Sequence, residues 1–382
     1  MGTETTNQNE PLVPDKRRQG DLFVCDVADA VLKDIIPQME HPFYSLSKKP
    51  EMTPRRYEHN GNWLEIVPSY KGLATIYDKD ILIYCISQLV EKLKQGLPVG
   101  PRIRITSYDL LSFTNRGTSG RDYLALSEAI DRLAGTRIKT NIRTGDEEQE
   151  DNFGLVDAAS IRRKHGLDGR LLWVEIKLSE WVLNAVRAQE VLTLHRDYFR
   201  LRKPLERRIY ELARKHCGRQ PTWKVSLDLL LKKCGSQSPM KRFRHMLKHI
   251  AKHDHLPDYR LTFDEDSDLV TFYSREAWWE AHPQIAQDAG ELPPLPTQAY
   301  EDAKKAAPGY DVYALEQDWR EWWDSSGRPK LDNPAAAFVG FCASRHKRAP
   351  LPGRGGPGRT TIADAVQAIS APSRGRGGSG RP

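Results

Sequence analysis

The chain has 382 residues, of which 39% are hydrophobic and 29% are charged, and its formal net charge is +7. This composition is typical of a globular protein with room for two or three domains. No apolar run approaches the roughly 20 residues that cross a bilayer, and the polar, acidic start does not resemble a secretory signal. The five cysteines lack CxxC spacing, which argues against a disulfide framework or a zinc knuckle and indicates a cytoplasmic protein.

The first predicted domain covers residues 21–190 and follows a leader (1–20) that is expected to be disordered. Short apolar and proline-containing pieces at its start are expected to form an N-terminal cap, and a helix is expected over 80–94. The elements expected next are a strand (103–105), a short helix capped by Thr106, a turn (115–117), a longer helix (119–133) and a strand (137–142).

The second predicted domain, 191–276, repeats the same order of elements. It begins with a helix over 205–217 and a short strand at 223–225. The elements expected after that strand are a helix capped by Ser226, a turn (234–236), a helix (239–252) and two strands (259–263 and 269–273) joined by an acidic turn (264–268).

Helix, strand, helix, turn, helix and β-hairpin is the order of a winged helix-turn-helix, whose helix after the turn enters the DNA major groove. The sequence therefore predicts an α+β chain with two tandem winged helix-turn-helix domains followed by a small C-terminal helical region. The second domain is expected to make the main contacts with DNA, because it carries most of the positive charge.

The C-terminal part begins with a predicted proline-rich, extended linker over 277–309. A small helical region is expected over 310–347, with helices at 311–324 and 333–345. Three tryptophans of the first helix either anchor a partner or form a small core, and the sequence favours neither: Trp319, Trp322 and Trp323. The Gly/Arg-rich tail, 348–382, is expected to be disordered.

Positive charge is concentrated between Tyr198 and Arg260, where 17 Lys and Arg residues accompany five acidic residues. This stretch carries +12, more than the whole chain, and a concentrated basic region is typical of nucleic-acid binding. A solvated helix face is the alternative, but such faces usually interleave acids with bases. Asp254 is the sole acid between Lys232 and Pro257, which favours contact with DNA or RNA.

The second domain supplies most of the candidate DNA contacts. Residues near the start of the 239–252 helix are expected to reach base edges, because Arg reads guanine and Gln reads adenine: Ser236, Gln237, Ser238, Lys241, Arg242 and His245. Phosphate contacts are expected from Lys248, Lys252, Arg207, Arg208, Arg214 and Lys215. The remaining candidates in this basic stretch are Arg219, Lys232, Lys233, Arg244 and His249.

The first domain is a weaker candidate, because the exposed side of its long helix is nearly neutral. Its best candidate DNA contacts are Arg116, Thr118, Ser119 and Arg121. A protein–protein or dimer interface is an equal alternative for this helix.

Signs of catalysis are weak. There is no GxxxxGK[ST] motif, which argues against a P-loop ATPase. His253 and His255 have the spacing of a metal pair in nicking enzymes, but they occupy a polar segment rather than a hydrophobic strand. The tyrosines Tyr123, Tyr198 and Tyr210 have no context that marks a nucleophile. We expect no enzymatic activity, no metal and no cofactor.

Several long stretches of the chain resemble the plasmid replication initiator protein A family. The matching stretches, which fall within about residues 21–275, are MEHPFYSLSKKP, RRYEHNGNWLEIVPSYKGLATIYDKDILIYCISQL, LLSFTNRGTSGRDYLALSEAIDRLAGTRIKTNIRTG and VLTLHRDYFRLRKPLERRIYELARKHCGRQPTWKVSLDLLLKKCGS. The resemblance implies a bacterial, plasmid-associated initiator that binds origin repeats in double-stranded DNA, helps to open the DNA and recruits host proteins such as the helicase. It also implies self-association as a dimer. A transcriptional repressor with the same domains and a Tyr-dependent nicking initiator are the alternatives.

Overall fold

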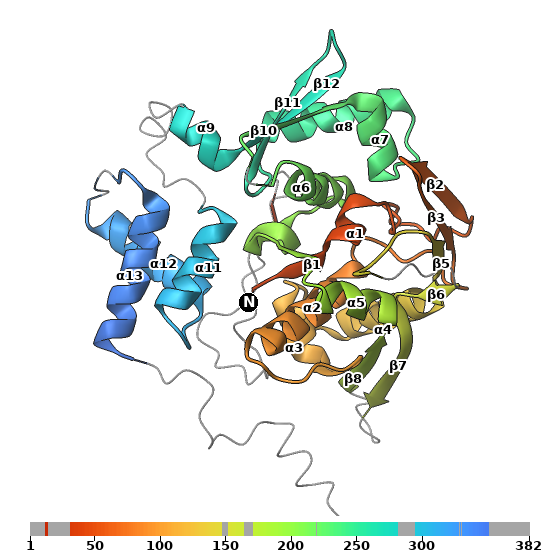
Figure 1. Ribbon diagram of the computed structural model, residues 1–382, viewed down its shortest axis with the longest axis horizontal. Coiled ribbons are helices and arrows are strands. Elements are labelled where there is room, and N and C mark those ends of the chain that lie inside the picture. Colours follow the sequence, from red (N-terminus) through yellow and green to blue (C-terminus); the bar gives the residue numbers. More distant parts are fainter. Residues whose placement is uncertain are drawn as a thin grey trace, which may run out of the picture.

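The computed structural model describes residues 12–13, 31–146, 152–163, 171–218, 220–281, 295–327, 329 and 331–350. Most of the expected leader and tail lies outside these residues, and so does Arg219. Buried apolar side chains form three cores. The first lies within residues 35–186, the second mainly within 194–272, and the third within 295–342. Helices occur together with antiparallel sheets, so the chain has a mixed helix and sheet architecture (Figure 1).

A three-stranded sheet with two helices forms what we call the first copy. Its elements are β4 (Arg102–Thr106), α3 (Ser107–Phe113), α4 (Gly120–Gly135), β7 (Val156–Arg163) and β8 (Leu171–Leu178). The strand order is β4-β8-β7, with every pair antiparallel. The Thr106 side chain accepts a hydrogen bond from the Asp109 amide at the start of α3, as its capping role predicts.

A second sheet corrects one sequence prediction for this copy. Its four strands, in the order β2-β3-β5-β6, are β2 (Arg55–His59), β3 (Asn62–Val67), β5 (Arg137–Thr140) and β6 (Phe153–Gly154). The strand expected after the long helix is β5, but it pairs with β3 rather than joining the sheet of the first copy. Alternating burial at Ile138 and Thr140 marks a strand, yet this pattern carries no information about its partner. The hairpin of the first copy is β7-β8 instead.

The second copy follows the predicted element order closely. It consists of β10 (Thr222–Ser226), α7 (Leu227–Cys234), α8 (Met240–His253), β11 (Tyr259–Asp264) and β12 (Leu269–Ser274). The strand order β10-β12-β11 is equivalent to that of the first copy. The Ser226 side chain caps α7, which ends at Gly235 with φ +65°. A side chain there would also collide with Pro42, so glycine is required at this turn.

Helices α2 and α6 connect the two copies. The elements around them are β1 (Lys33–Ile35), α1 (Ile36–Glu40), α2 (Lys79–Lys94), α5 (Glu180–Arg187), β9 (Val191–Thr193), the 3₁₀ helix η1 (Arg196–Arg200) and α6 (Pro204–His216). Lys79 at the start of α2 is fully buried, and its Nζ lies 2.6 Å from Asp34 and 2.9 Å from Glu211 of α6. The copies are therefore joined by buried, paired charges as well as by apolar packing.

The C-terminal part contains α9 (Arg275–Ala281), α11 (Thr297–Ala306), α12 (Val312–Ser325) and α13 (Pro334–Arg348). Helix α11 lies in the stretch for which the sequence predicted an extended linker. It is ordered as a helix because Ala299, Tyr300 and Ala303 are buried against α12 and α13. Trp319 is fully buried in this core, whereas Trp322 is 47% exposed. Helices α11, α12 and α13, the C-terminal helices, lie at one side of the molecule (Figure 1). No helix among the described residues combines the length and apolar character needed to cross a membrane.

Candidate nucleic-acid interface

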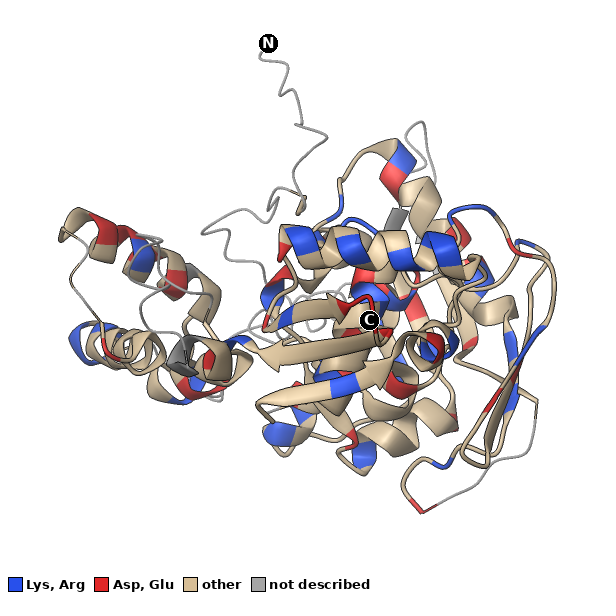
Figure 2. Ribbon diagram, turned by 90° about the horizontal axis from the view of Figure 1, so that it is seen from above, with Lys and Arg blue, Asp and Glu red and all other residues tan. Residues whose placement is uncertain are grey.

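Helix α8 presents the main basic surface of the described chain. Phe243, Leu247 and Ile250 recur at helical spacing and are buried against the second core. The opposite side is exposed and carries Lys241, Arg242, His245, Lys248 and Lys252. In Figure 2, which views the molecule from above, blue bands of Lys and Arg recur along a long helix that lies beside the strands at the centre of the picture. Because the apolar stripe is buried, the cations lie on the solvent-exposed side of the helix.

Three of these cations have no acidic partner. Lys241, Arg242 and Lys252 form no ion pair with any described residue. Their charge is not neutralised within the fold, which leaves it available to an anionic ligand. This arrangement agrees with the prediction that the start of α8 contacts nucleic acid, although contact itself stays a prediction.

The β11-β12 hairpin binds two other cations of α8. Arg244 lies 2.8 Å from Asp268, and Lys248 lies 2.6 Å from Glu265. The acidic turn expected from the sequence therefore faces α8 rather than standing apart from it. Both pairs are solvent-exposed, so each contributes little stability and competes directly with a phosphate for its cation.

Three predicted DNA contacts are buried, two of them predicted for phosphates, and their burial contradicts a contact with DNA. Arg207 is 4% exposed, Arg208 is 3% exposed and Lys233 is 5% exposed. Arg207 bonds Asp80 at 2.7 Å and the carbonyl oxygens of Leu201 and Phe199. These side chains satisfy acids and carbonyl groups inside the protein, so they are not free to bind DNA.

Arg208 illustrates how completely such a side chain is used. Its Nη1 donates to the Met39 carbonyl at 2.8 Å and to Glu211 at 3.1 Å. Its Nη2 donates to the Glu40 carbonyl at 3.0 Å and the Lys233 carbonyl at 2.8 Å. This guanidinium holds α1, α6 and the end of α7 together.

Arg214 and Lys215, at the end of α6, are half-buried and contact other parts of the chain. Arg214 donates to the Thr193 carbonyl at 2.7 Å, and Lys215 pairs with Glu40 at 3.1 Å. Both residues line a cleft shared with Thr297 and Glu301 of α11. They therefore face the C-terminal helices, and the structure does not group them with the exposed cations of α8.

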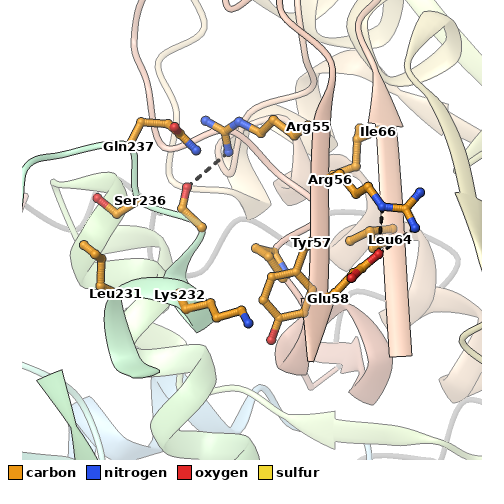
Figure 3. Close-up of a pocket in the computed structure, with 12 residues that line it drawn as sticks. Arg55, Arg56, Tyr57, Glu58, Leu64, Ile66, Leu231, Lys232, Ser236 and Gln237 are labelled. Atoms are coloured by element: carbon orange, nitrogen blue, oxygen red, sulfur yellow. Dashed lines mark hydrogen bonds and ion pairs between the residues drawn. The ribbon is translucent and has the colours of Figure 1, made fainter. Parts of the chain in front are cut away.

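The turn before α8 lines a cleft of about 450 Å³ that the sequence did not reveal. Ser236 and Gln237 lie on one side, together with exposed Lys232, and β2 forms the other side (Figure 3). Arg55 of β2 donates to the Gly235 carbonyl at 3.2 Å. Arg56 beside it is exposed but pairs with Glu58 at 2.6 Å, so Arg55 is the cation that β2 places at the predicted base-reading turn. The adjacent pair Arg55-Arg56 was the only sequence signal for it.

Other candidates of the second copy take varied positions. Ser238 is half-buried just before α8. His249 lies 3.3 Å from Lys203 Nζ, and its ring stacks on His253 with centroids 3.9 Å apart. His255 is buried beside Glu206 at 3.2 Å. Among the described residues, no group of His, Cys, Asp and Glu is arranged to hold a metal ion.

The candidates of the first copy lie at the start of α4. Thr118, Ser119 and Arg121 are exposed, as a DNA contact requires. Asp122 accepts a hydrogen bond from the Ser119 amide at 2.9 Å, which caps the helix. Arg116 pairs with the buried carboxylate of Asp80 at 3.0 Å, so its charge is neutralised within the protein.

Comparisons with known proteins give evidence about the family of this chain that is independent of the geometry of the site. A family model described as Replication initiator protein A matches residues 33–261. A protein of Wigglesworthia glossinidia brevipalpis, named "Putative replication protein", is 38% identical over 258 residues, or 67% of this chain and 94% of that protein. A solved structure of RctB domains 2 and 3 is similar over 63% of this chain and 98% of its own, with 14% identity and a TM-score of 0.47. The Pi initiator protein in complex with iteron DNA is similar over 52% of this chain and 92% of its own, with 14% identity and a TM-score of 0.34.

Proposed function

Because this chain belongs to the replication initiator protein A family, we propose that it starts plasmid replication by binding repeats of double-stranded origin DNA. Bound there, it promotes opening of the adjacent DNA and recruits host replication proteins, including the helicase. The family match supports replication initiation in general. The choice of repeats, the opening step and the recruited proteins belong to the proposal.

The observation that carries DNA binding is the row of unpaired cations on α8. A helix with an apolar inner side and cations on its outer side fits the major groove, where Arg binds guanine through two hydrogen bonds. Arg242 and Lys241 lie in its first turn, where recognition helices contact bases. Lys252 and Lys248 lie further along and suit phosphates.

The equivalent strand orders of the two copies support two winged-helix modules. In each copy the first strand pairs with the last, and a hairpin follows the second helix. We assign DNA reading to the second module. The first module, whose exposed helix is nearly neutral, either adds contacts through Ser119 and Arg121 or forms the interface of a dimer.

We propose that initiation requires no strand cleavage by this protein. Tyr198 and Tyr210 are fully buried, and their hydroxyl groups donate to Glu211 at 2.6 Å and Asp258 at 2.9 Å. Burial, followed by repulsion from these carboxylates, raises the pKa of both phenols well above the ordinary value. A nucleophile needs the reverse, namely access to DNA and an easily lost proton.

The test is a footprint of the purified protein on its plasmid's origin, with competitor DNA and without added metal. We expect protection at regularly spaced repeats, lost in Lys241→Ala and kept in Lys347→Ala, which removes the same charge from α13. Binding without a protected sequence would contradict origin recognition. A covalent protein–DNA adduct would favour a nicking enzyme, and protection without plasmid replication in cells would favour a repressor.

A further inference from the structure

A cleft of about 470 Å³ separates the first copy from the entry to α6, and its lining is strongly basic. The loop before β2 contributes Lys48 and Lys49, α4 contributes Arg132, and the segment before α6 contributes Arg202. Lys71 and Arg116 complete six cations, against a single lining acid, Asp78. We call this site the inter-copy cleft.

Half of these cations are neutralised within the protein. Arg132 pairs with Asp78 at 2.7 Å, Arg116 with Asp80 at 3.0 Å and Lys71 with Asp131 at 3.0 Å. Those pairs hold the walls of the cleft in place.

The other three cations are free. Lys48, Lys49 and Arg202 have no acidic partner among the described residues. The Arg202 Nε is moreover buried and donates to no acceptor in the described chain. Arg202 as a whole is only partly buried and lines the cleft, so an anion there would pair with a guanidinium that no described acid neutralises.

The walls are preorganised, which suits binding rather than a mobile surface. The Leu73 amide donates to the Glu51 carbonyl at 2.9 Å, and the Ser45 hydroxyl donates to the Glu51 carboxylate at 2.7 Å. Gly72, with φ +94°, packs so closely on Pro50 and Glu51 that a side chain would not fit. On the far wall, the Tyr77 hydroxyl donates to the Arg202 carbonyl at 2.7 Å.

One residue beside the cleft contacts α8. Lys203 follows Arg202 directly, is exposed, and places its Nζ 3.3 Å from His249 of α8. Lys203, which also pairs with Glu206 at 3.5 Å, thus lies between α8 and Arg202 of the cleft, and Arg116 lines the cleft just before α4. The cleft and α8 therefore bring cations from both copies within one contact of each other.

We propose that the inter-copy cleft binds backbone phosphates of the same DNA duplex that α8 grips, so that one strand crosses from one copy to the other. This inference rests on the proposed DNA-binding function and adds a site to it. Arg202 suits a phosphate because its planar guanidinium donates two parallel hydrogen bonds, while Lys48 and Lys49 act as point charges. Such contacts position the protein on DNA and carry no base specificity.

The test compares the wild type with the Lys48→Ala/Lys49→Ala/Arg202→Ala variant on origin DNA over a range of salt concentrations. Each lost phosphate contact lowers the slope of log K against log salt by about 0.9, so we expect a slope about 2 to 3 smaller. Affinity should fall for specific and random DNA alike, and backbone protection between the two module sites should disappear. Base protection beneath α8 should remain.

The matched control is Lys305→Ala/Lys347→Ala/Arg348→Ala, which removes three cations from the C-terminal helices. An equal loss of slope in this control would overturn the proposal, because net charge would then explain the effect. The Lys48→Ala/Lys49→Ala variant, altered only in an exposed loop, should lose about 2 units of slope even if Arg202→Ala impairs folding. An unchanged slope in both cleft variants, with origin protection intact in the wild type, would overturn the cleft while leaving origin binding standing. Binding of ATP that the cleft variants lose, with DNA binding unaltered, would also overturn it and indicate a nucleotide site.

Discussion

Helices α6 and α8 belong to the same basic stretch of the chain, yet they use their cations in opposite ways. Arg207 and Arg208 of α6 lie inside the protein, whereas Lys241 and Arg242 of α8 lie on its surface without acidic partners among the described residues. Positive charge in α6 therefore serves folding, and positive charge in α8 is available for binding. Charge density along a sequence does not by itself identify a binding surface.

The difference follows from what surrounds each helix. Helix α8 packs through one apolar stripe at the edge of the second core, so its other sides meet solvent. Helix α6 lies between the two copies and is buried from Leu205 to Ala213. Its arginines meet Asp80 of α2, Glu211 of α6 and the carbonyl groups that end α1. Asp80, distant in sequence, and Glu211 of α6 itself thus neutralise these arginines, and no described acid pairs with Lys241 or Arg242 in the first turn of α8.

The largest effect is expected from Arg208→Ala in α6. Removing this guanidinium takes one charged donor from Glu211 and leaves the carbonyl groups of Met39 and Lys233 buried without it, which should cost about 3–5 kcal/mol of unfolding free energy. Urea denaturation would measure it. Arg242→Ala in α8 is the control and should change stability by no more than about 0.5 kcal/mol. Equal stability losses in the two variants would abolish the distinction between the helices.

The second-largest effect is expected on acidification, which should lower the free energy of unfolding through histidines near α6. Burial lowers the pKa of His41 to about 4, and burial with repulsion by Lys233 and Lys215 lowers that of His216 to about 4. Each ring binds its proton more readily when unfolded, near the ordinary value of 6.5. Their stabilising contribution is therefore complete above pH 6.5 and is lost as the pH falls toward 4.

Asp34 opposes this trend, because burial raises its pKa to about 6 and protonation below that value favours the folded state. Urea titrations at pH 7 and pH 5 would measure the balance. The double change His41→Gln/His216→Gln should reduce the loss of stability on acidification, whereas His253→Gln on the exposed side of α8 should not. A loss unaltered by the double change would show that other groups control it.

Specific DNA affinity should decline in Arg242→Ala by about 1–3 kcal/mol if the side chain reads a base. The physical reason is the loss of a paired hydrogen bond to a base edge, and mobility-shift titrations on a single repeat would measure it. Binding to random DNA should change less than binding to the repeat. A uniform loss on both DNAs would assign Arg242 to a phosphate instead.

The smallest effect is expected from Glu265→Gln, which releases Lys248 from its pair with the hairpin. The exposed pair is worth less than about 1 kcal/mol, so affinity for all DNA should rise by less than tenfold. The gain should vanish at high salt because exposed charges are then screened. Glu321→Gln on α12 removes one negative charge elsewhere, and an equal gain there would show that the pair has no specific role.

Local patterns predicted the second copy well, since each of its elements carries its own signal. Ser226 marks a helix start, Gly235 a helix end, and Phe243, Leu247 and Ile250 mark the inner side of α8. The first copy was predicted less well because its hairpin, β7-β8, lies well beyond the strand that follows α4. Strand β5 had the right periodicity but the wrong partner, since pairing depends on distant residues.

By itself, the sequence determined the order of elements in the second copy, the apolar stripe of α8, the excess of positive charge and the resemblance to replication initiators. These properties depend on neighbouring residues or on extended identity. Only the tertiary structure decided that Arg207, Arg208 and Lys233 are buried, that Glu265 and Asp268 face α8, and that Arg202 meets Lys48 across a cleft. Whether a cation folds a protein or binds its ligand depends on which acids come near it, and folding brings them from far along the chain.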